Sequence, residues 1–227
     1  MKERGDEHVV TTLATEMGVP VTVAGLMAQR GITTKQQAEE FFNPTLESLH
    51  DPFLMKDMNR AVDRIATAIS RNEKILVYGD YDVDGTTSVA MLYSFLRERH
   101  SCLDYYIPDR YHEGYGLSSR GIDYAAGGGC KLIIALDCGI KAVEKVKYAR
   151  SKGIDIIICD HHLPGEGIPD ATAVLDPKQP GCGYPYKEMS GCGVGFKLMQ
   201  AICMVQGIPF EEIIPYLDLV AVSIGSD

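Results

Sequence analysis

Short apolar segments alternate with helical patterns along most of this chain, and an acidic residue directly follows several of the apolar segments. The apolar runs that can form strands cover residues 75–78, 105–107, 132–136, 154–159 and 173–175. Stretches with helical spacing lie between them, at residues 86–99, 118–126 and 140–152. Strands that alternate with helices form parallel sheets, because each parallel connection needs a crossover. The sequence therefore predicts an α/β fold with a mainly parallel sheet flanked by helices.

The first part of the chain lacks this alternation and reads as short helices. Thr34 and Gln37 form a capping-box pattern at the start of one helix, and Pro44 follows its end. We therefore expect residues 1–55 to form a small N-terminal helical segment and residues 56–227 to form the α/β domain.

The last part of the chain is less regular. Residues 177–195 are rich in Gly, Pro, Cys and Tyr and predict a long loop, followed by helices at 196–206 and 210–219. Residues 220–224 read as a final strand, directly before Gly, Ser and Asp227. Because the chain stops just after this strand pattern, we expect it to be a fragment of a longer protein.

Carboxylates gather at the predicted ends of the strands. In an open parallel sheet, the carboxyl ends of the strands form the crevice where ligands bind. Two unit charges ~4 Å apart repel by about 4 kcal/mol even at an effective dielectric constant of 20, so such a cluster needs cations. The sequence therefore predicts a divalent-metal site built from the acids that follow four apolar segments: Asp80, Asp82, Asp84, Asp137, Asp160 and Asp227.

Other interpretations of the first acidic cluster fit the sequence less well. A single Asp after a strand is most often a helix N-cap or a turn residue. An EF-hand calcium loop that began at Asp80 would need Glu at its twelfth position, which is Met91. A P-loop would need Gly-Lys-Ser/Thr, which is absent. If the segment is extended, Asp80, Asp82 and Asp84 point to the same side.

Two adjacent histidines follow an acid at another strand end. His161 can bind a metal ion, while His162 can transfer a proton near neutral pH, and Asp160 can orient one of the rings. Oxygen ligands with one imidazole favour Mn²⁺ or Mg²⁺ over structural zinc. The set is typical of a two-metal hydrolytic site in which Asp137 bridges the ions, and it favours phosphoester cleavage over peptide cleavage.

Composition excludes several classes of protein. The apolar runs are far shorter than the ~18 residues of a membrane span, and the N-terminus has no signal-peptide pattern, so we expect a cytoplasmic protein without membrane contact. The seven cysteines include no CxxC pair, which argues against a disulfide framework and a zinc finger. The net charge of −9 argues against sequence-blind attraction to nucleic acid unless bound cations reverse the local sign.

Four short motifs occur in a characteristic order: GDYDVDG at 79–85, LDCG at 136–139, DHH at 160–162 and SIGSD at 223–227. Their order and spacing resemble motifs I to IV of the DHH phosphoesterases. Segments 107–118 and 190–198 are more similar to the bacterial single-strand-specific exonucleases of that family than to its nanoRNA phosphatases or family II pyrophosphatases. The resemblance covers nearly the whole chain.

The resemblance implies a 5′-to-3′ exonuclease on single-stranded DNA that needs Mn²⁺ or Mg²⁺, two ions in the complete site. It also implies a role in recombination and repair, with a helicase or a single-strand-binding protein as partner. Some relatives carry His at the position of Tyr78, so one ion would be held by Asp80 instead or held more weakly. The positions that match the family's metal ligands are Asp82, Asp84, Asp137, His161 and Asp227, and the candidate catalytic residues are Asp137, Asp160 and His162.

Candidate substrate contacts lie beside these motifs. His162 matches the family's second histidine and is assigned to phosphate contact and protonation of the leaving group. Arg110 can form bidentate hydrogen bonds to a DNA phosphate or a surface ion pair. Tyr111 and Tyr115 can stack on bases or simply pack within the protein. Gly193 can allow close approach of a substrate or form part of a turn.

The family carries a second α/β domain and an OB-fold barrel beyond the fourth motif, and this chain contains neither. We therefore expect a chain that binds metal but has little or no processive nuclease activity alone. Two alternatives stay open at this stage. The same chemistry could act on short oligonucleotides, cyclic dinucleotides or pyrophosphate, or the chain could be a non-catalytic scaffold.

Overall fold

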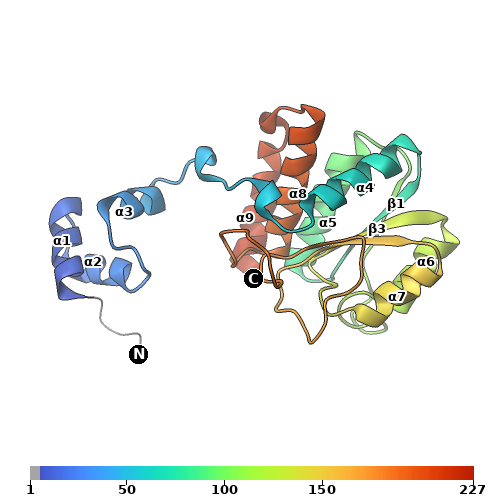
Figure 1. The fold of residues 1–227 in the computed structure, drawn as a ribbon, viewed down its shortest axis with the longest axis horizontal. Helices are drawn as coiled ribbons and strands as arrows, with labels where there is room; N and C mark the ends of the chain where they lie inside the picture. The colour runs from blue at the N-terminus through green and yellow to red at the C-terminus, as the bar shows by residue number, and fades with distance from the viewer. Residues whose placement is uncertain (1–5) are drawn as a thin grey trace. The chain divides into compact units, whose positions relative to one another are not determined.

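The computed structural model describes residues 6–227, which form two compact units (Figure 1). The first unit ends at Leu49 and the second begins at His50, whereas the sequence analysis divides the chain after residue 55. The first unit contains three short helices around a small apolar core of Leu13, Ala24, Met27, Ile32 and Ala38. Its helices are α1 (Glu7–Met17), α2 (Val21–Ala28) and α3 (Lys35–Phe42), followed by the 3₁₀ turn η1 (Leu46–Ser48).

The second unit is built on a five-stranded, entirely parallel sheet, which confirms the predicted α/β fold, and its strand order is β2-β1-β3-β4-β5. The strand order reverses direction between β1 and β3, so the crevice expected of an α/β sheet lies at the carboxyl ends of these two strands. The strands are β1 (Lys74–Gly79), β2 (Leu103–Tyr106), β3 (Cys130–Leu136), β4 (Asp155–Cys159) and β5 (Ala173–Leu175).

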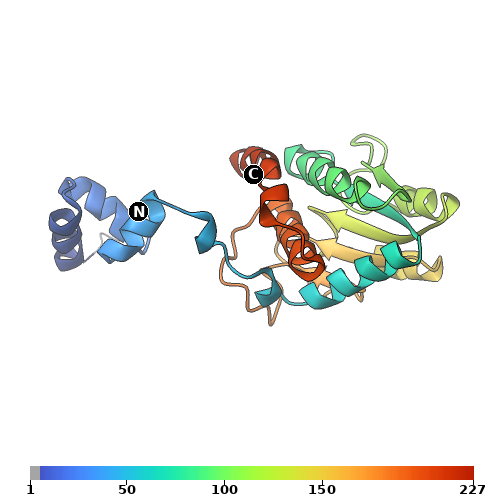
Figure 2. The same cartoon turned by 90° about the horizontal axis from the view of Figure 1, so that it is seen from above.

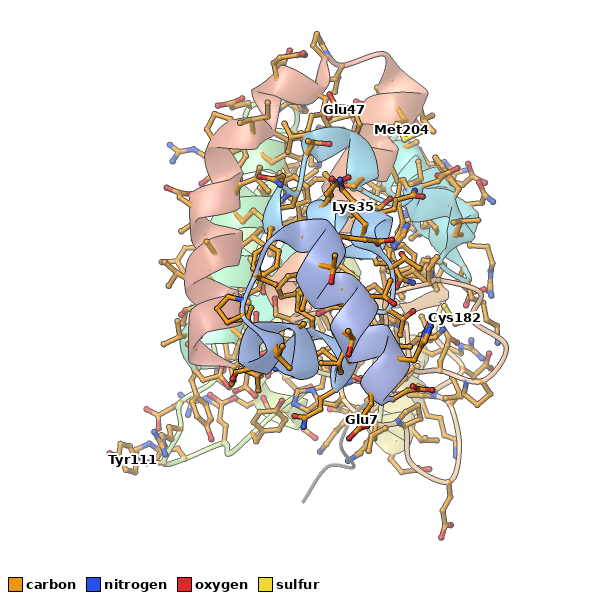
Figure 3. The ribbon with its side chains drawn as sticks, turned by 90° about the vertical axis from the view of Figure 1, so that its left-hand side faces the viewer. Glu7, Lys35, Glu47, Tyr111, Cys182 and Met204 are labelled. Carbon is orange, nitrogen blue, oxygen red and sulfur yellow. The ribbon has the colours of Figure 1, made fainter. Side chains whose placement is uncertain are left out.

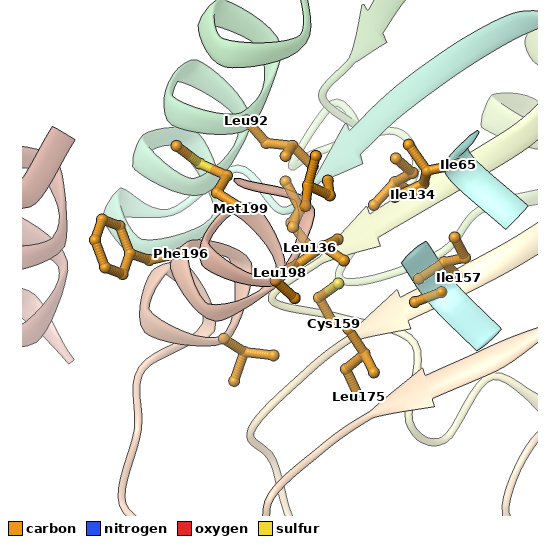
Figure 4. Packing of buried hydrophobic residues seen from close by; sticks show 14 of the residues in the cluster. Ile65, Leu92, Ile134, Leu136, Ile157, Cys159, Leu175, Phe196, Leu198 and Met199 are labelled. Atoms are coloured by element: carbon orange, nitrogen blue, oxygen red, sulfur yellow. The ribbon is translucent and has the colours of Figure 1, made fainter. Parts of the chain in front are cut away.

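Helices cover both faces of the sheet, which explains why the central strands are continuous apolar runs (Figure 2). Val77, Ile134 and Ile157 are neighbours across three strands and belong to one core, with residues of α4, α5 and α8 (Figure 4). The next residue of each strand points to the other core, with residues of α6 and α7. The helices are α4 (Met58–Ser70), α5 (Val83–Arg97), α6 (Ser119–Gly127), α7 (Val143–Ser151), α8 (Gly191–Gln206) and α9 (Leu217–Ser226).

The structure corrects three predictions about local structure. Residues 220–224 are not a strand but lie within α9, because the buried Val220 and Ser223 are spaced by one helical turn. Helix α5 begins at Val83, several residues before the predicted 86, because the Asp82 side chain caps it. The predicted helix at 210–219 is two 3₁₀ turns, η3 (Phe210–Glu212) and η4 (Ile214–Tyr216), and only its last three residues are α-helical, as the start of α9.

The predicted loop at 177–195 is also shorter than expected, since α8 already begins at Gly191. Ser190 caps this helix through a hydrogen bond from the amide of Gly193. Within residues 6–227, no helix is both long enough and apolar enough to cross a membrane.

Gly79 is a place where β1 and α5 approach closely, and it provides a test of the packing. A Cβ atom at this position would lie 2.3 Å from Cγ2 of Val89 and 2.8 Å from the carbonyl oxygen of Gly85. We expect Gly79→Ala to lower the free energy of unfolding by about 1–3 kcal/mol, the usual cost of overpacking. Urea denaturation measures this change.

The matched control is Gly127→Ala at the end of α6, where a Cβ atom would have no neighbour within 4 Å. This variant should unfold at the wild-type urea concentration or slightly above it. Equal stability of the two variants would contradict the close contact between β1 and α5.

Candidate metal centre

Three acids follow β1, β3 and β4 directly, where the strand order reverses. Asp80, Asp137 and Asp160 are each almost completely buried. Asp137 has a positive φ of 58°, which Asp tolerates better than most residues, and its amide donates to the carbonyl oxygen of Cys159. This backbone turn directs the Asp137 side chain toward the first turn of α8, where a Cβ atom on Gly191 would lie 2.6 Å from Cβ of Asp137.

His161 lies at the centre of the acidic cluster. Its Nε2 atom is 3.1 Å from Oδ1 of Asp137 and 3.6 Å from Oδ2 of Asp84, and its Nδ1 atom is 3.7 Å from Oδ2 of Asp227. Two groups of three side chains have ligand atoms within 4.8 Å of one another: Asp84, His161 and Asp227, and Asp137, His161 and His162. Segments that are distant in sequence therefore meet at one point.

Several buried polar atoms in this cluster have no hydrogen-bond partner. They are Oδ2 of Asp80, together with Oδ1 of Asp137 and Nε2 of His161, which face each other at 3.1 Å without the geometry of a hydrogen bond. Unpartnered buried polar atoms cost stability, and such atoms call for an explanation such as a bound ion. Carboxylate oxygens with one imidazole nitrogen are also suitable ligands for Mn²⁺ or Mg²⁺. The residues present thus fit a divalent-metal site.

The electrostatics of the cluster favour bound protons when no cation is present. Burial raises the pKa of Asp137 to about 7, and the nearby carboxylates of Asp84 and Asp82 add to this shift. Burial alone would lower the pKa of His161, but the carboxylates of Asp137, Asp227 and Asp84 outweigh it and raise the pKa to about 9. Protons therefore occupy the site near neutral pH, where a cation would supply the same positive charge.

The first motif is not extended as far as Asp84, which corrects the backbone arrangement predicted from the sequence. Asp80 is buried and accepts a hydrogen bond from the amide of Tyr81. Asp82 is exposed and caps α5, where its Oδ1 accepts from the amide of Gly85. Asp84 lies in the first turn of α5 and is buried. The early start of α5 changes the backbone that carries Asp84, while Asp82 and Asp84 both lie near enough to Asp137 to raise its pKa.

The carboxylate of Asp84 is bound by the N-terminus of α8 and by α9. It accepts hydrogen bonds from the amides of Gly191 (2.6 Å) and Cys192 (2.8 Å) and from the hydroxyl of Ser223 (2.7 Å). The first amides of a helix favour negative charge, so the N-terminus of α8 is a suitable partner for a carboxylate. The sequence analysis did not assign Gly191 or Ser223 to the site, although both lie in segments that carry the family resemblance.

Asp160 holds the adjacent histidine. Its Oδ1 atom accepts from the amides of His161 and His162 and lies 2.7 Å from Nδ1 of the His162 ring, while its Oδ2 accepts from the amide of Ile140. Burial would raise the pKa of Asp160, but the His162 ring and the backbone amides outweigh it and lower the pKa. Asp160 therefore orients the His162 ring, as predicted for an acid beside this histidine pair.

The predicted substrate contacts lie at different distances from the cluster. The hydroxyl of Tyr115 is 3.2 Å from the carbonyl oxygen of Asp137, so this residue belongs to the site. Arg110 and Tyr111 are exposed on the loop between β2 and α6 (Figure 3), and the Arg110 guanidinium lies 5.3 Å from the ring centre of Tyr81. Gly193 is buried in α8, and its amide is used in capping that helix.

Two further residues clarify the ligand set. Tyr78 is fully buried, and its hydroxyl donates to the carbonyl oxygen of Gly116, so it does not take the place of a histidine ligand. Asp176 follows β5 directly and is fully buried, and its Oδ2 atom has no partner. Burial raises the pKa of Asp176 to about 6. The sequence analysis missed this acid, although it shows the same strand-end signal as the others.

Comparisons with known proteins agree with this geometry. The single-stranded-DNA-specific exonuclease RecJ of Bacillus subtilis is 42% identical over 225 residues, which cover 99% of this chain and 28% of that protein. A crystal structure of exonuclease RecJ bound to manganese is 30% identical with a TM-score of 0.68, over 74% of this chain and 42% of the other. The structure of RecJ from Thermus thermophilus in complex with Mn²⁺ is 25% identical with a TM-score of 0.77, over 97% of this chain and 31% of the other.

The chain thus spans well under half of the length of these relatives. The family model described as the DHH family, N-terminal domain, matches residues 74–224, which is more than half of the chain and includes the first three motifs entirely. The resemblance predicted from the motifs is confirmed, and the chain belongs to the DHH family.

Proposed function

We propose that this chain is the catalytic part of a single-strand-specific 5′-to-3′ DNA exonuclease that hydrolyses phosphodiester bonds with Mn²⁺ or Mg²⁺. The observation that supports it best is the set of buried, unpartnered ligand atoms on Asp80, Asp137 and His161. The relatives named RecJ, and their structures with manganese, support the choice of reaction and of metal.

The residues that would bind the metal ions lie around His161. Asp137 belongs next to both ions, because it contacts His161 directly and lies between the ends of β1 and β4. Bound divalent ions would neutralise the phosphate oxygens and activate a water molecule. The proposed ligands are Asp80, Asp82, Asp84, Asp137, His161 and Asp227.

His162 would protonate the leaving oxygen. Its side chain is partly exposed at the edge of the cluster, so it can meet a substrate. The hydrogen bond to Asp160 raises the pKa of His162, which keeps more of the ring protonated at neutral pH. Asp160 would therefore orient and charge the proton donor.

Single-stranded DNA is the proposed substrate, with Arg110 and Tyr115 as contacts on the loop between β2 and α6. The proposal includes a cytoplasmic role in DNA repair and recombination, together with a helicase or a single-strand-binding protein. These assignments rest on the relatives, of which this chain covers only a part.

Hydrolysis of end-labelled oligonucleotides tests the proposed function. With Mn²⁺, a single-stranded oligonucleotide should be shortened from its 5′ end, slowly, and a duplex should remain intact. His162→Ala should lower the rate by about 10²–10⁴-fold, the usual contribution of a general acid. His8→Ala, at an exposed position of α1 outside the site, is the matched control. Faster cleavage of dinucleotides or pyrophosphate than of the oligonucleotide would instead support a small-substrate phosphoesterase.

Calorimetric titration with Mn²⁺ tests the metal site apart from activity. Asp137→Asn keeps the shape and the tolerance of positive φ but removes a charged ligand, so we expect at least about a tenfold loss of affinity. Asp123→Asn, at an exposed ion pair with Lys152, should bind like the wild type. No binding by the wild type, or equal binding by Asp137→Asn, would favour a non-catalytic scaffold.

The pH dependence of Mn²⁺ binding follows from the raised pKa values of Asp137 (about 7) and His161 (about 9). Protons on these groups must leave before a cation binds, so the affinity should rise between pH 6 and 8, by about tenfold per pH unit for each proton displaced. Calorimetry in buffers of different ionisation enthalpy counts the released protons. A constant affinity over this range would rule out the protonated cluster.

A further inference from the structure

The loop between β2 and α6, residues 107–118, is fixed by buried hydrogen bonds. The hydroxyl of Tyr78, in β1, donates to the carbonyl oxygen of Gly116 (2.8 Å) and accepts from the amide of Ser118 (3.1 Å). The carboxylate of Glu113 accepts from the hydroxyl of Tyr106, in β2, at 2.8 Å. The core of the sheet therefore determines where this loop lies.

Tyr115 is carried by this loop, and its hydroxyl points into the site while about half of its surface is exposed. The hydroxyl lies 3.0 Å from Nε2 of His162 and 3.2 Å from the carbonyl oxygen of Asp137. The ring also meets the His162 ring edge-on, with 5.7 Å between the ring centres. One hydroxyl group can donate one hydrogen bond and accept others, so it can serve both neighbours.

The His162 ring is thus held from two directions. Asp160 contacts Nδ1 at 2.7 Å, and the Tyr115 hydroxyl lies 3.0 Å from Nε2 and 3.4 Å from Nδ1, so it meets the ring between its two nitrogen atoms. The contact at Nδ1 alone leaves the ring free to tilt, and the contact with Tyr115 limits this tilt. Partners of this kind determine the orientation of a functional imidazole.

We propose that Tyr115 is a positioning residue that acts through its hydroxyl on His162, and that Tyr78 supports it by holding the loop. The proposal rests on the role given above to His162 as proton donor. It differs from base stacking by Tyr115, because stacking needs the ring and positioning needs the hydroxyl.

Steady-state kinetics of oligonucleotide hydrolysis with Mn²⁺ separates these two roles. Tyr115→Phe keeps the ring, so positioning predicts a kcat about 10–100-fold lower with a KM within about twofold of the wild type. The double variant Tyr115→Phe/His162→Ala should be no slower than His162→Ala alone. Tyr78→Phe, which keeps the buried ring, should show a smaller change of the same kind.

The matched control is Tyr148→Phe, which removes a hydroxyl bound to Asp123 in α6, outside the site, and should leave kcat unchanged. A wild-type kcat in Tyr115→Phe, with a raised KM in Tyr115→Ala, would overturn positioning in favour of stacking. A loss in the double variant equal to the product of the two single losses would overturn it too.

A spectroscopic measurement tests the contact between Tyr115 and His162 without relying on catalytic activity. Long-range ¹H–¹⁵N spectra of the histidine rings, with His162 assigned from the His162→Ala variant, report on its Nε2 atom. We expect Tyr115→Phe to shift and broaden the Nε2 signal of His162, while the signals of the distant His100 stay unchanged. An unchanged His162 signal would refute the contact, even if the chain proves inactive and the proposed function fails.

Discussion

The repulsion between carboxylates that meet at one edge of the sheet is the constraint on which the rest of this structure depends. Parallel strands end side by side, so acids that follow them cannot avoid one another. Asp137 and His161 are buried at this edge, and the polar atoms with which they face each other at 3.1 Å lack the geometry of a hydrogen bond. An arrangement of this kind costs stability unless protons or cations enter it. The fold tolerates this loss of stability because the same atoms can bind metal.

The fold treats the neighbouring acids in different ways, and each way suits a different task. The carboxylate of Asp84 accepts hydrogen bonds from the first amides of α8 and from Ser223. Asp160 accepts hydrogen bonds at both oxygens, from three backbone amides and from the His162 ring, which makes it a support for that ring. Burial raises the pKa of Asp137, so this carboxyl group binds a proton more readily than an exposed one. All three residues are aspartates, so the differences between their roles come from their surroundings.

Much of this arrangement could be predicted from the sequence, because strand ends and the residues that follow them are local features. The parallel sheet and the meeting of Asp137 with His161 follow from that pattern. The strand predicted at 220–224 was wrong, because a short apolar run fits a strand or a buried helix equally well until its packing partners are known. The contacts of Asp84 with α8, and of Tyr115 with His162, depend on tertiary approach, which a single sequence does not encode locally.

The missing side chain of Gly191 has a consequence for the whole centre. A Cβ atom there would collide with Asp137, so α8 can reach the sheet edge only as bare backbone. The same backbone amide binds Asp84, a residue from another helix. The backbone of Gly191 thus lies against Asp137 and binds Asp84 at the same time. A bulkier residue at position 191 would push α8 away from Asp137, although the sequence would still contain every acid and histidine of the centre.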